Sequence, residues 1–239
     1  MSMSGGAQGT LRRAAGLLRD RQQAAAFRRA VVVAAQPGMV TVGDLRGGGF
    51  EVPGQALGPT SVVYVAGAGS DGGVAPGIVA RFGCTVNLYD ADPRAAEHVA
   101  RVAAREPRVA FHPVALWDAD VTVTVHAPRL GGYQAHRPSD LPGSHESFSA
   151  PARSLADALA TDGHDHADLL CVAVDGAEYR LVDHILRAPV DVRALCLRWA
   201  QPAPLERVLE SLGRLRGAGF EPVARSGDAT AWKTTLIRT

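Results

Sequence analysis

The sequence predicts an α/β protein with a doubly wound, Rossmann-like, mostly parallel sheet and an antiparallel hairpin at its C-terminus. Short apolar runs alternate with helical patterns between residues 61 and 218, which is typical of β/α units and a parallel sheet. The first apolar run ends in a glycine-rich loop. The last two runs flank Ser226-Gly227-Asp228-Ala229, a sequence that favours a hairpin turn.

The chain is expected to divide at about residue 60. Residues 1–59 form an N-terminal extension, in which a helical pattern runs from about Thr10 to Ala35. Its apolar positions predict a stripe that packs on the main domain. Residues 37–60 are rich in Gly and Pro and predict a connecting or covering segment. Residues 60–239 form the main domain.

The main domain is expected to contain five sheet strands, an extra strand, a variable polar segment and five helices. The sheet strands are Ser61–Ala66, Thr85–Tyr89, Arg108–Leu116, Asp168–Val174 and Val192–Trp199, and the extra strand is Asp120–His126. The polar segment covers 127–150. The helices are one that ends near Phe82, then Pro93–Arg105, Ser154–Ala160, Glu178–Leu186 and Leu205–Ala218, and the hairpin is Phe220–Arg225 with Thr230–Arg238.

The composition restricts the partners. The formal net charge is +1, which excludes a strongly cationic nucleic-acid binder and argues against a polybasic membrane anchor. Of the 25 basic residues only Lys233 is a lysine, so lysine-based chemistry is nearly excluded. We therefore expect a small-molecule partner, no nucleic acid and no membrane, and the N-terminal helix could mediate a homodimer.

The three cysteines, Cys84, Cys171 and Cys196, lie in apolar runs without C-x-x-C spacing. They predict buried free thiols rather than a disulfide framework. No stretch approaches the ~18 apolar residues of a membrane span. A soluble protein in the reducing cytoplasm is expected.

The glycine-rich loop follows the first strand and opens a helix, with Gly67, Gly69 and Asp71 in it. Ligands of doubly wound sheets bind beyond the carboxyl ends of the strands, and glycines let the backbone approach them. An ordinary tight turn is the alternative. The position after a strand favours a cofactor-binding loop.

Two further strand ends complete a predicted nucleoside site. Asp90 ends the second strand about 20 residues after the glycine loop, where such sheets hydrogen-bond a ribose. Asp92 lies directly before Pro93 and is the better candidate for a helix N-cap. Leu116 and Trp117, at the end of the third strand, could contact an adenine or be ordinary core. These residues do not separate S-adenosylmethionine (SAM) from NAD.

Several blocks of the sequence resemble FkbM-type SAM-dependent methyltransferases, over roughly residues 60–238. The blocks are VYVAGAGSD at 63–71, FGCTV at 82–86, DADP at 90–93, FHPVALW at 111–117, PARSL at 151–155, GHDHADLL at 163–170 and DGAEY at 175–179. The resemblance is closest to a branch with a tyrosine-led glycine loop. It implies the class I methyltransferase fold, whose sheet closes with an antiparallel hairpin, and SAM as the cofactor.

The sequence departs from this family on two strands. Members usually read Leu-Lys-x-Asp-x-Glu-Gly-x-Glu along the fourth strand, where this chain has Cys171 for the lysine and Ala173 for the aspartate. Where the fifth strand usually ends in Glu-Phe-His, this chain has Arg198 and Ala200 for the acid and the histidine. The resemblance therefore supports the fold and the cofactor more than the reaction.

Asp175 and Glu178 follow the fourth strand and are the candidate catalytic residues. A hydroxyl acceptor needs a base within hydrogen-bond reach, and these acids could orient the acceptor or take its proton. Helix capping for Asp175 and a first-turn acid for Glu178 are the alternatives. Histidines of the 120–150 segment (His126, His136 and His145) could serve instead, in a lid over the site.

The run Asp162-Gly163-His164-Asp165-His166-Ala167-Asp168 resembles a set of metal ligands. It precedes the fourth strand and so lies at the opposite edge of the sheet. A structural role is therefore expected for it, and no metal site is predicted.

Three functions stay open. The favoured one is O-methylation of a small hydroxylated metabolite, such as a sugar or a product of specialised metabolism, with orientation supplying much of the catalysis. The second is a SAM-binding enzyme with altered chemistry, such as a cyclisation or rearrangement. The third is a noncatalytic SAM-binding subunit. Hydride transfer on NAD is least supported, because the C-terminal hairpin fits methyltransferases better.

Overall fold

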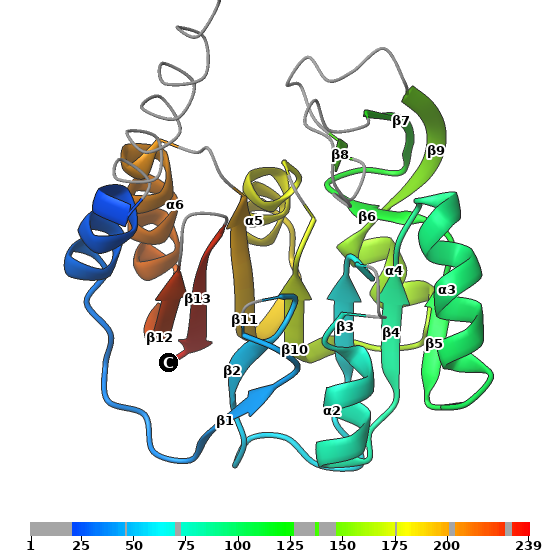
Figure 1. Cartoon of the computed structure of the whole chain (residues 1–239), viewed down its shortest axis with the longest axis horizontal. Helices are drawn as coiled ribbons and strands as arrows, with labels where there is room; N and C mark the ends of the chain where they lie inside the picture. Colours follow the sequence, from blue (N-terminus) through cyan, green and yellow to red (C-terminus); the bar gives the residue numbers. More distant parts are fainter. Residues whose placement is uncertain are drawn as a thin grey trace, which may run out of the picture.

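A seven-stranded sheet forms the centre of the molecule (Figure 1). Its order is β12-β13-β11-β10-β3-β4-β5, with β3, β4, β5, β10 and β11 parallel and β13 antiparallel to both β11 and β12. The computed structural model describes residues 21–45, 47–69, 73–126, 137–138, 147–174, 176–200, 204–227 and 231–239. This order confirms the predicted doubly wound sheet with its C-terminal hairpin.

The strands of the large sheet are β3 (Val63–Ala66), β4 (Val86–Tyr89), β5 (Val109–His112), β10 (His166–Val172), β11 (Asp191–Ala200), β12 (Phe220–Gly227) and β13 (Ala231–Arg238). The helices are α2 (Ala75–Phe82), α3 (Pro93–Ala103), α4 (Leu155–Thr161), α5 (Glu178–Arg187) and α6 (Leu205–Gly217). Residues 21–30 are also helical. The remaining strands are β1 (Met39–Val42), β2 (Phe50–Pro53), β6 (Ala115–Trp117), β7 (Val121–His126), β8 (Arg137–Pro138) and β9 (Ser147–Ser154).

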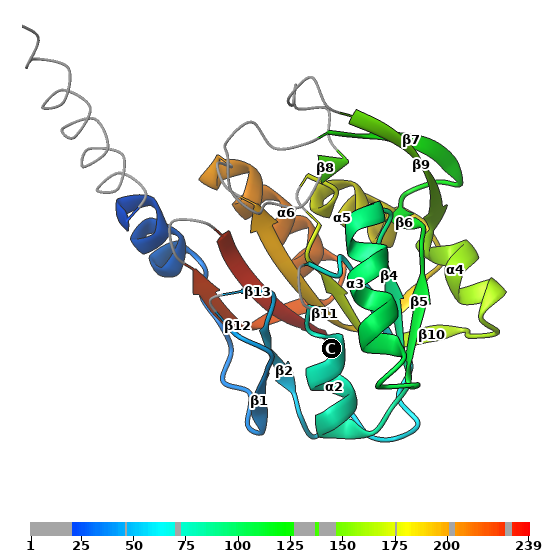
Figure 2. The same cartoon turned by 45° about the vertical axis from the view of Figure 1, so that its right-hand side comes forward.

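Both faces of the large sheet are covered (Figures 1 and 2). The 21–30 helix, α4, α5 and α6 contribute to the core on one face, while α2, α3 and the β1–β2 hairpin contribute to the core on the other. Successive side chains of β3 therefore point to opposite faces of the sheet. Tyr64 packs in the core with α4, α5 and α6, whereas Val63 and Val65 pack in the core with α2 and α3. Burial on both faces explains why the parallel strands are almost continuously apolar.

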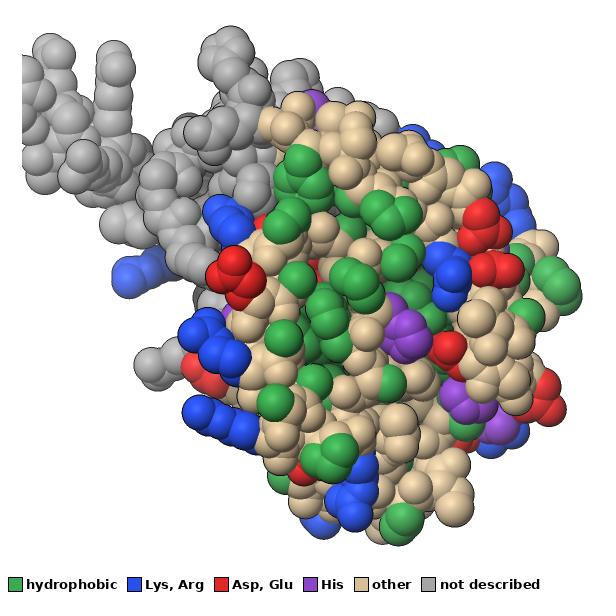
Figure 3. Space-filling model, turned by 90° about the vertical axis from the view of Figure 1, so that its right-hand side faces the viewer, with side chains coloured by type: hydrophobic (Ala, Val, Ile, Leu, Met, Phe, Trp, Pro, Cys, Tyr) green, Lys and Arg blue, Asp and Glu red, His purple; other side chains and the backbone are tan. Residues whose placement is uncertain are grey.

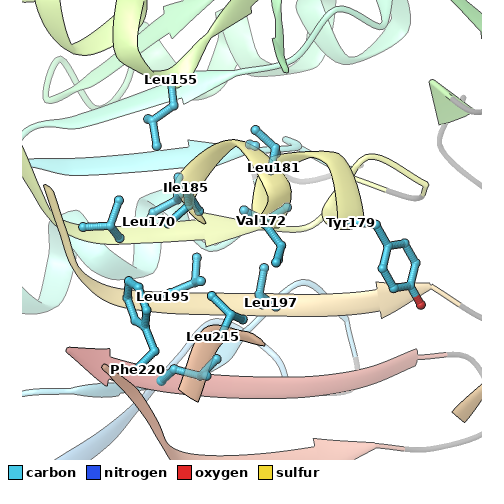
Figure 4. Packing of buried hydrophobic residues seen from close by; sticks show 14 of the residues in the cluster. Leu155, Leu170, Val172, Tyr179, Leu181, Ile185, Leu195, Leu197, Leu215 and Phe220 are labelled. Carbon is cyan, nitrogen blue, oxygen red and sulfur yellow. The ribbon is translucent and has the colours of Figure 1, made fainter. Parts of the chain in front are cut away.

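The first core is centred on the two middle strands. Figure 4 shows Leu170 and Val172 of β10 beside Leu195 and Leu197 of β11, with α5 packed over them. Tyr179 of α5 lies beyond the end of this packed group (Figure 4). The close packing fixes the position of α5, whose first turn follows the carboxyl end of β10.

The N-terminal helix is shorter than predicted. It packs on the main domain as expected, since the ring of Phe27 stacks on Trp232 with centroids 4.8 Å apart. The prediction that helix continues through residues 31–35 is wrong, because this segment is not helical and the Ala34 amide donates to the Pro222 carbonyl at 2.8 Å. Three consecutive valines at 31–33 disfavour helix. Residues 10–20 of the prediction lie outside the described part of the chain.

The predicted third strand is two strands in different sheets. It breaks at Pro113, which has no amide hydrogen for a ladder bond, and β5 ends there. The following β6 joins a second sheet, of order β6-β9-β7-β8, which we call the upper sheet. Its strand β7 confirms the extra strand predicted at 120–126. In Figure 1 the upper sheet lies above the carboxyl ends of β3 and β4.

The three cysteines are free and buried, as predicted. Cys171 and Cys196 lie directly opposite each other on β10 and β11 in the core beneath α2. Burial raises the pKa of the Cys171 thiol well above its ordinary value. The position where FkbM-type methyltransferases have a lysine is thus a packed, neutral core position here. Within the described ranges, no helix combines the length and hydropathy needed to cross a bilayer.

The buried imidazole of His184 should make the fold sensitive to acid. His184 is 9% exposed on α5, and its Nε2 accepts a hydrogen bond from the Ala156 amide of α4 at 3.4 Å. Burial lowers the pKa of His184 below its ordinary 6.5. The unfolded chain therefore takes up the proton first as the pH falls below about 6.5, and the free energy of unfolding decreases. Urea unfolding from pH 7.5 to 5 should show this decrease.

The matched variant is His184→Gln, whose side-chain oxygen can still accept the Ala156 amide but cannot titrate. We expect a shallower dependence of unfolding free energy on pH in this variant, with near-normal stability at pH 7.5. Parallel pH curves for the two proteins would show that His184 does not contribute.

Candidate functional site

The glycine loop adopts backbone conformations that only glycine takes readily. Gly67, Gly69 and Gly73 have φ values of 96°, 56° and 62°, all in the left-handed region. The loop leaves the carboxyl end of β3 and leads into α2, as predicted. Asp71, a predicted cofactor-binding residue, lies outside the described residues.

Gly67 also makes a close backbone approach. A Cβ atom at this position would lie 2.5 Å from the carbonyl oxygen of Ala173, just after β10. The Gly67 amide donates to the Tyr89 carbonyl of β4 at 2.9 Å. Gly67 therefore joins the ends of three neighbouring strands, β10, β3 and β4, and places the glycine loop at the point where the strand order reverses.

Asp90 ties the end of β4 to the glycine loop. Its Oδ2 accepts the amide of Ala68 and its Oδ1 accepts the amide of Asp92, both at 2.8 Å. The carboxylate is thus fixed beside the glycine loop, where the sequence predicted it. Asp92 caps α3, since its side chain accepts the Arg94 amide at 2.9 Å, which confirms the capping prediction.

Leu116 and Trp117 are both core residues, 2% and 8% exposed. Leu116 belongs to the large core, whereas Trp117 packs in a small cluster of the upper sheet. Ala91, which follows Asp90, and Val174, which follows β10, pack against that same cluster. Trp117 therefore lies close to the carboxyl ends of β4 and β10, and adenine contact by either residue stays a prediction.

Arg180 connects the upper sheet to α5. Its guanidinium carbon lies 5.3 Å from the centre of the Trp117 ring, and its Nη1 lies 3.5 Å from Oδ2 of Asp118. Local sequence patterns do not predict this contact, because the partners are more than 60 residues apart in the chain. It links the upper sheet to α5.

The segment predicted as a lid, residues 120–150, contributes β7, β8 and the start of β9 to the upper sheet, and its role as a lid stays a prediction. His126 is the last residue of β7 and is partly buried, whereas His136 and His145 lie outside the described residues. The strands β7 and β9 pair along their length, from Val121 with Ala152 to His126 with Ser147. A hydrogen-bonded sheet, rather than an irregular segment, thus covers this side of the strand ends.

Glu178 joins two segments at the carboxyl ends of β10 and β11. It is 1% exposed, its Oε2 accepts the Gly176 amide at 2.7 Å, and its Oε1 accepts the Ala200 amide at 3.2 Å. Through these two hydrogen bonds, the Glu178 carboxylate holds the turn between β10 and α5 against the end of β11. The catalytic role predicted for Glu178 remains a prediction, and Asp175 lies outside the described residues.

The acidic and histidine run at 162–168 has the predicted structural role. Oδ2 of Asp168 accepts the Val62 amide at 2.9 Å. Oδ2 of Asp162 accepts the hydroxyls of Tyr64 at 2.8 Å and Tyr89 at 3.2 Å. Burial raises the pKa of both tyrosines. Among the described residues, no group of three or more His, Cys, Asp or Glu side chains could hold a metal ion.

His112 is a residue that sequence reasoning missed. It ends β5, and its ring stacks on Tyr89 with centroids 4.3 Å apart and planes 7° from parallel. Burial lowers its pKa, so the ring is neutral near pH 7, and its buried Nε2 has no partner among the described residues. The signal that could have identified it is its place at a strand end, next to Asp90.

No protein-family model matches the sequence, and no curated protein matches it. Among solved structures, the chain is similar to the fibrillarin pre-rRNA processing protein of Methanococcus jannaschii (13% identity, 76% of this chain and 67% of that chain, TM-score 0.46). It is also similar to a precorrin-6y C5,15-methyltransferase of Geobacter metallireducens (11% identity, 76% and 83% covered, TM-score 0.46). A third similar structure is Aeropyrum pernix fibrillarin with natively bound SAM (11% identity, 81% and 72% covered, TM-score 0.48).

Proposed function

We propose that the chain is a SAM-dependent methyltransferase that O-methylates a small hydroxylated metabolite. The observation that carries the proposal is the carboxylate of Asp90, bonded to the Ala68 amide of the glycine loop at 2.8 Å. This pair lies at the reversal point of a doubly wound sheet that ends in an antiparallel hairpin. The resemblance of seven sequence blocks to FkbM-type methyltransferases supports the same assignment.

The residues present fit the nucleoside part of SAM. A carboxylate offers about four lone-pair sites, and two amides occupy one site on each oxygen of Asp90. A ribose hydroxyl is a donor of the kind that such a carboxylate accepts. The left-handed glycines allow the backbone to approach a ligand without a Cβ in the way. When bound, SAM supplies a methyl group carried on a positively charged sulfur. A nucleophile attacks the carbon of this methyl group in line with its bond to the sulfur.

The chain itself orients the reactants and excludes water. Gly67 and Glu178 hold the loops after β3 and β10 in place, and the upper sheet with Trp117 covers the strand ends. Both oxygens of Glu178 already accept amides, so Asp175 is the better candidate to accept the proton of an acceptor hydroxyl. We therefore propose orientation by the loops and proton acceptance by Asp175.

A small neutral or weakly charged acceptor agrees with the charge of the protein. The formal net charge is +1, and Figure 3 shows acidic and basic side chains interspersed around a largely uncharged centre on one face. A nucleic-acid substrate would favour a continuous basic surface. These observations support a metabolite rather than a polyanion.

A calorimetric titration tests the cofactor. We expect SAM and its demethylated product to bind at micromolar concentration and NAD not to bind, because the sheet ends in the antiparallel β12–β13 hairpin that fits methyltransferases better. Absence of SAM binding at millimolar concentration would refute the proposal. With SAM bound, a mass gain of ~14 Da in a panel of hydroxylated acceptors supports methylation. Binding without any such gain favours altered chemistry or a noncatalytic subunit.

A further inference from the structure

The chain's single lysine is buried and holds a turn that lies far away in the sequence. Lys233 of β13 is 5% exposed. Its Nζ donates to the carbonyl oxygens of Leu45, Gly47 and Gly49 at 2.8, 2.5 and 2.8 Å. These three carbonyls belong to residues 43–49, which connect β1 to β2 and which we call the β1–β2 turn. One ammonium group thus fixes three points of the turn.

The chemistry of this contact requires lysine. An ammonium group has three N–H donors that diverge from one atom, whereas the donors of a guanidinium lie in one plane. Three carbonyls that converge on one atom therefore match lysine and not arginine. Every other basic residue of the chain is an arginine, so the lysine occurs at the position where arginine could not make the same three bonds.

The charge of Lys233 also needs these carbonyls. Lys233 lies directly opposite Arg198 in the β11–β13 pairing, and like charges in register repel each other. The negative ends of three carbonyl dipoles compensate the ammonium. Loss of the turn would remove three acceptors that compensate this buried charge.

The β1–β2 turn packs directly against the glycine loop and the start of α2. A Cβ on Gly48 would lie 3.5 Å from Cα of Gly73, and a Cβ on Gly43 would lie 3.8 Å from Cα of Val74. A Cβ on Gly77 of α2 would lie 3.0 Å from the amide nitrogen of Gly43. The turn therefore packs against Gly73, at the end of the glycine loop, and against the first turn of α2.

We propose that Lys233 is a positioning residue for cofactor binding. By fixing the β1–β2 turn, it holds the glycine loop in the conformation that accepts the cofactor. The role rests on the proposed function, since the ligand of the glycine loop is SAM in that proposal. Lys233 acts through the turn and touches no cofactor atom itself.

The test compares Lys233→Met with Thr235→Val. Thr235 lies two residues away on β13, and its Oγ1 donates to the Glu51 carbonyl of β2 at 2.6 Å, so it anchors the strand rather than the turn. Both variants should be less stable than the wild type in urea unfolding. Only Lys233→Met should weaken SAM binding, by about tenfold, because preorganisation of the loop is lost. Lys233→Arg should not restore the affinity.

The outcomes separate the two proposals. If the wild type binds SAM and Lys233→Met binds it equally well, the positioning role is refuted and the proposed function stands. If the wild type does not bind SAM, the proposed function fails. A loss of affinity in Thr235→Val equal to that in Lys233→Met would also refute the role, since general destabilisation would then explain both.

Hydrogen exchange of the wild type gives a second measurement if Lys233→Met does not fold. With SAM added, amide exchange should slow together in the β1–β2 turn and in residues 67–74. Slowing in the glycine loop with no change in the turn would show that the two are not coupled, and would overturn the inference.

Discussion

Asp90→Asn is expected to weaken SAM binding by about 10- to 100-fold, the effect of losing charge-assisted hydrogen bonds. The amide group can present only one oxygen, so its NH2 would face either the Ala68 amide or the Asp92 amide, both of which now donate to the carboxylate at 2.8 Å. The ribose hydroxyls would meet a weaker acceptor as well. Calorimetric titration with SAM measures the change.

Asp92→Ala is the matched control, because Asp92 lies two residues after Asp90 in the loop between β4 and α3. Asp92 caps α3 through the Arg94 amide, so its loss should cost about 1 kcal/mol of stability and leave the affinity for SAM unchanged. Equal SAM affinity in Asp90→Asn and the wild type would contradict the assignment of Asp90 to the cofactor.

Glu178→Gln is expected to lower the free energy of unfolding by about 2 kcal/mol, the scale of an unpaired buried donor. Glu178 is 1% exposed and each of its oxygens accepts one amide. In glutamine one oxygen becomes an NH2 group, which would face the amide of Gly176 or of Ala200. Urea unfolding monitored by circular dichroism measures the loss.

The control for this change is Glu206→Gln. Glu206 is also an acid in the first turn of a helix, but it is exposed, so its neutralisation should alter stability by less than about 0.5 kcal/mol. Unchanged unfolding of Glu178→Gln together with a lost reaction rate would instead assign Glu178 to the reaction centre, as the sequence predicted.

The features that could be predicted from the sequence depend on residues close together in the chain. The glycine loop, Asp90 and the Asp92 cap lie within about one β/α unit, where strand periodicity and capping chemistry determine the local structure. The parallel sheet follows from the repetition of that unit. The C-terminal hairpin follows from its turn residues.

The features that could not be predicted depend on distant contacts. The clamp role of Glu178 requires Ala200, which the strand β11 brings into place, and local spacing indicates only a first-turn acid. The pairing of β6 with β9 moves Leu116 and Trp117 from the large sheet to the upper sheet, although their apolar pattern reads as a continuation of β5. In both cases tertiary packing decides between local alternatives.

The burial of Lys233 has a consequence for the covalent chemistry of the whole chain. Reagents and enzymes that acylate or otherwise modify side-chain amines need an accessible, unprotonated amine, and the single lysine here is 5% exposed with its Nζ bonded to three carbonyls. The folded protein is therefore resistant to side-chain amine modification. Reaction at Lys233 reports the release of its ammonium group from the β1–β2 turn, so the rate of acylation at this one site measures how often the turn and Lys233 separate.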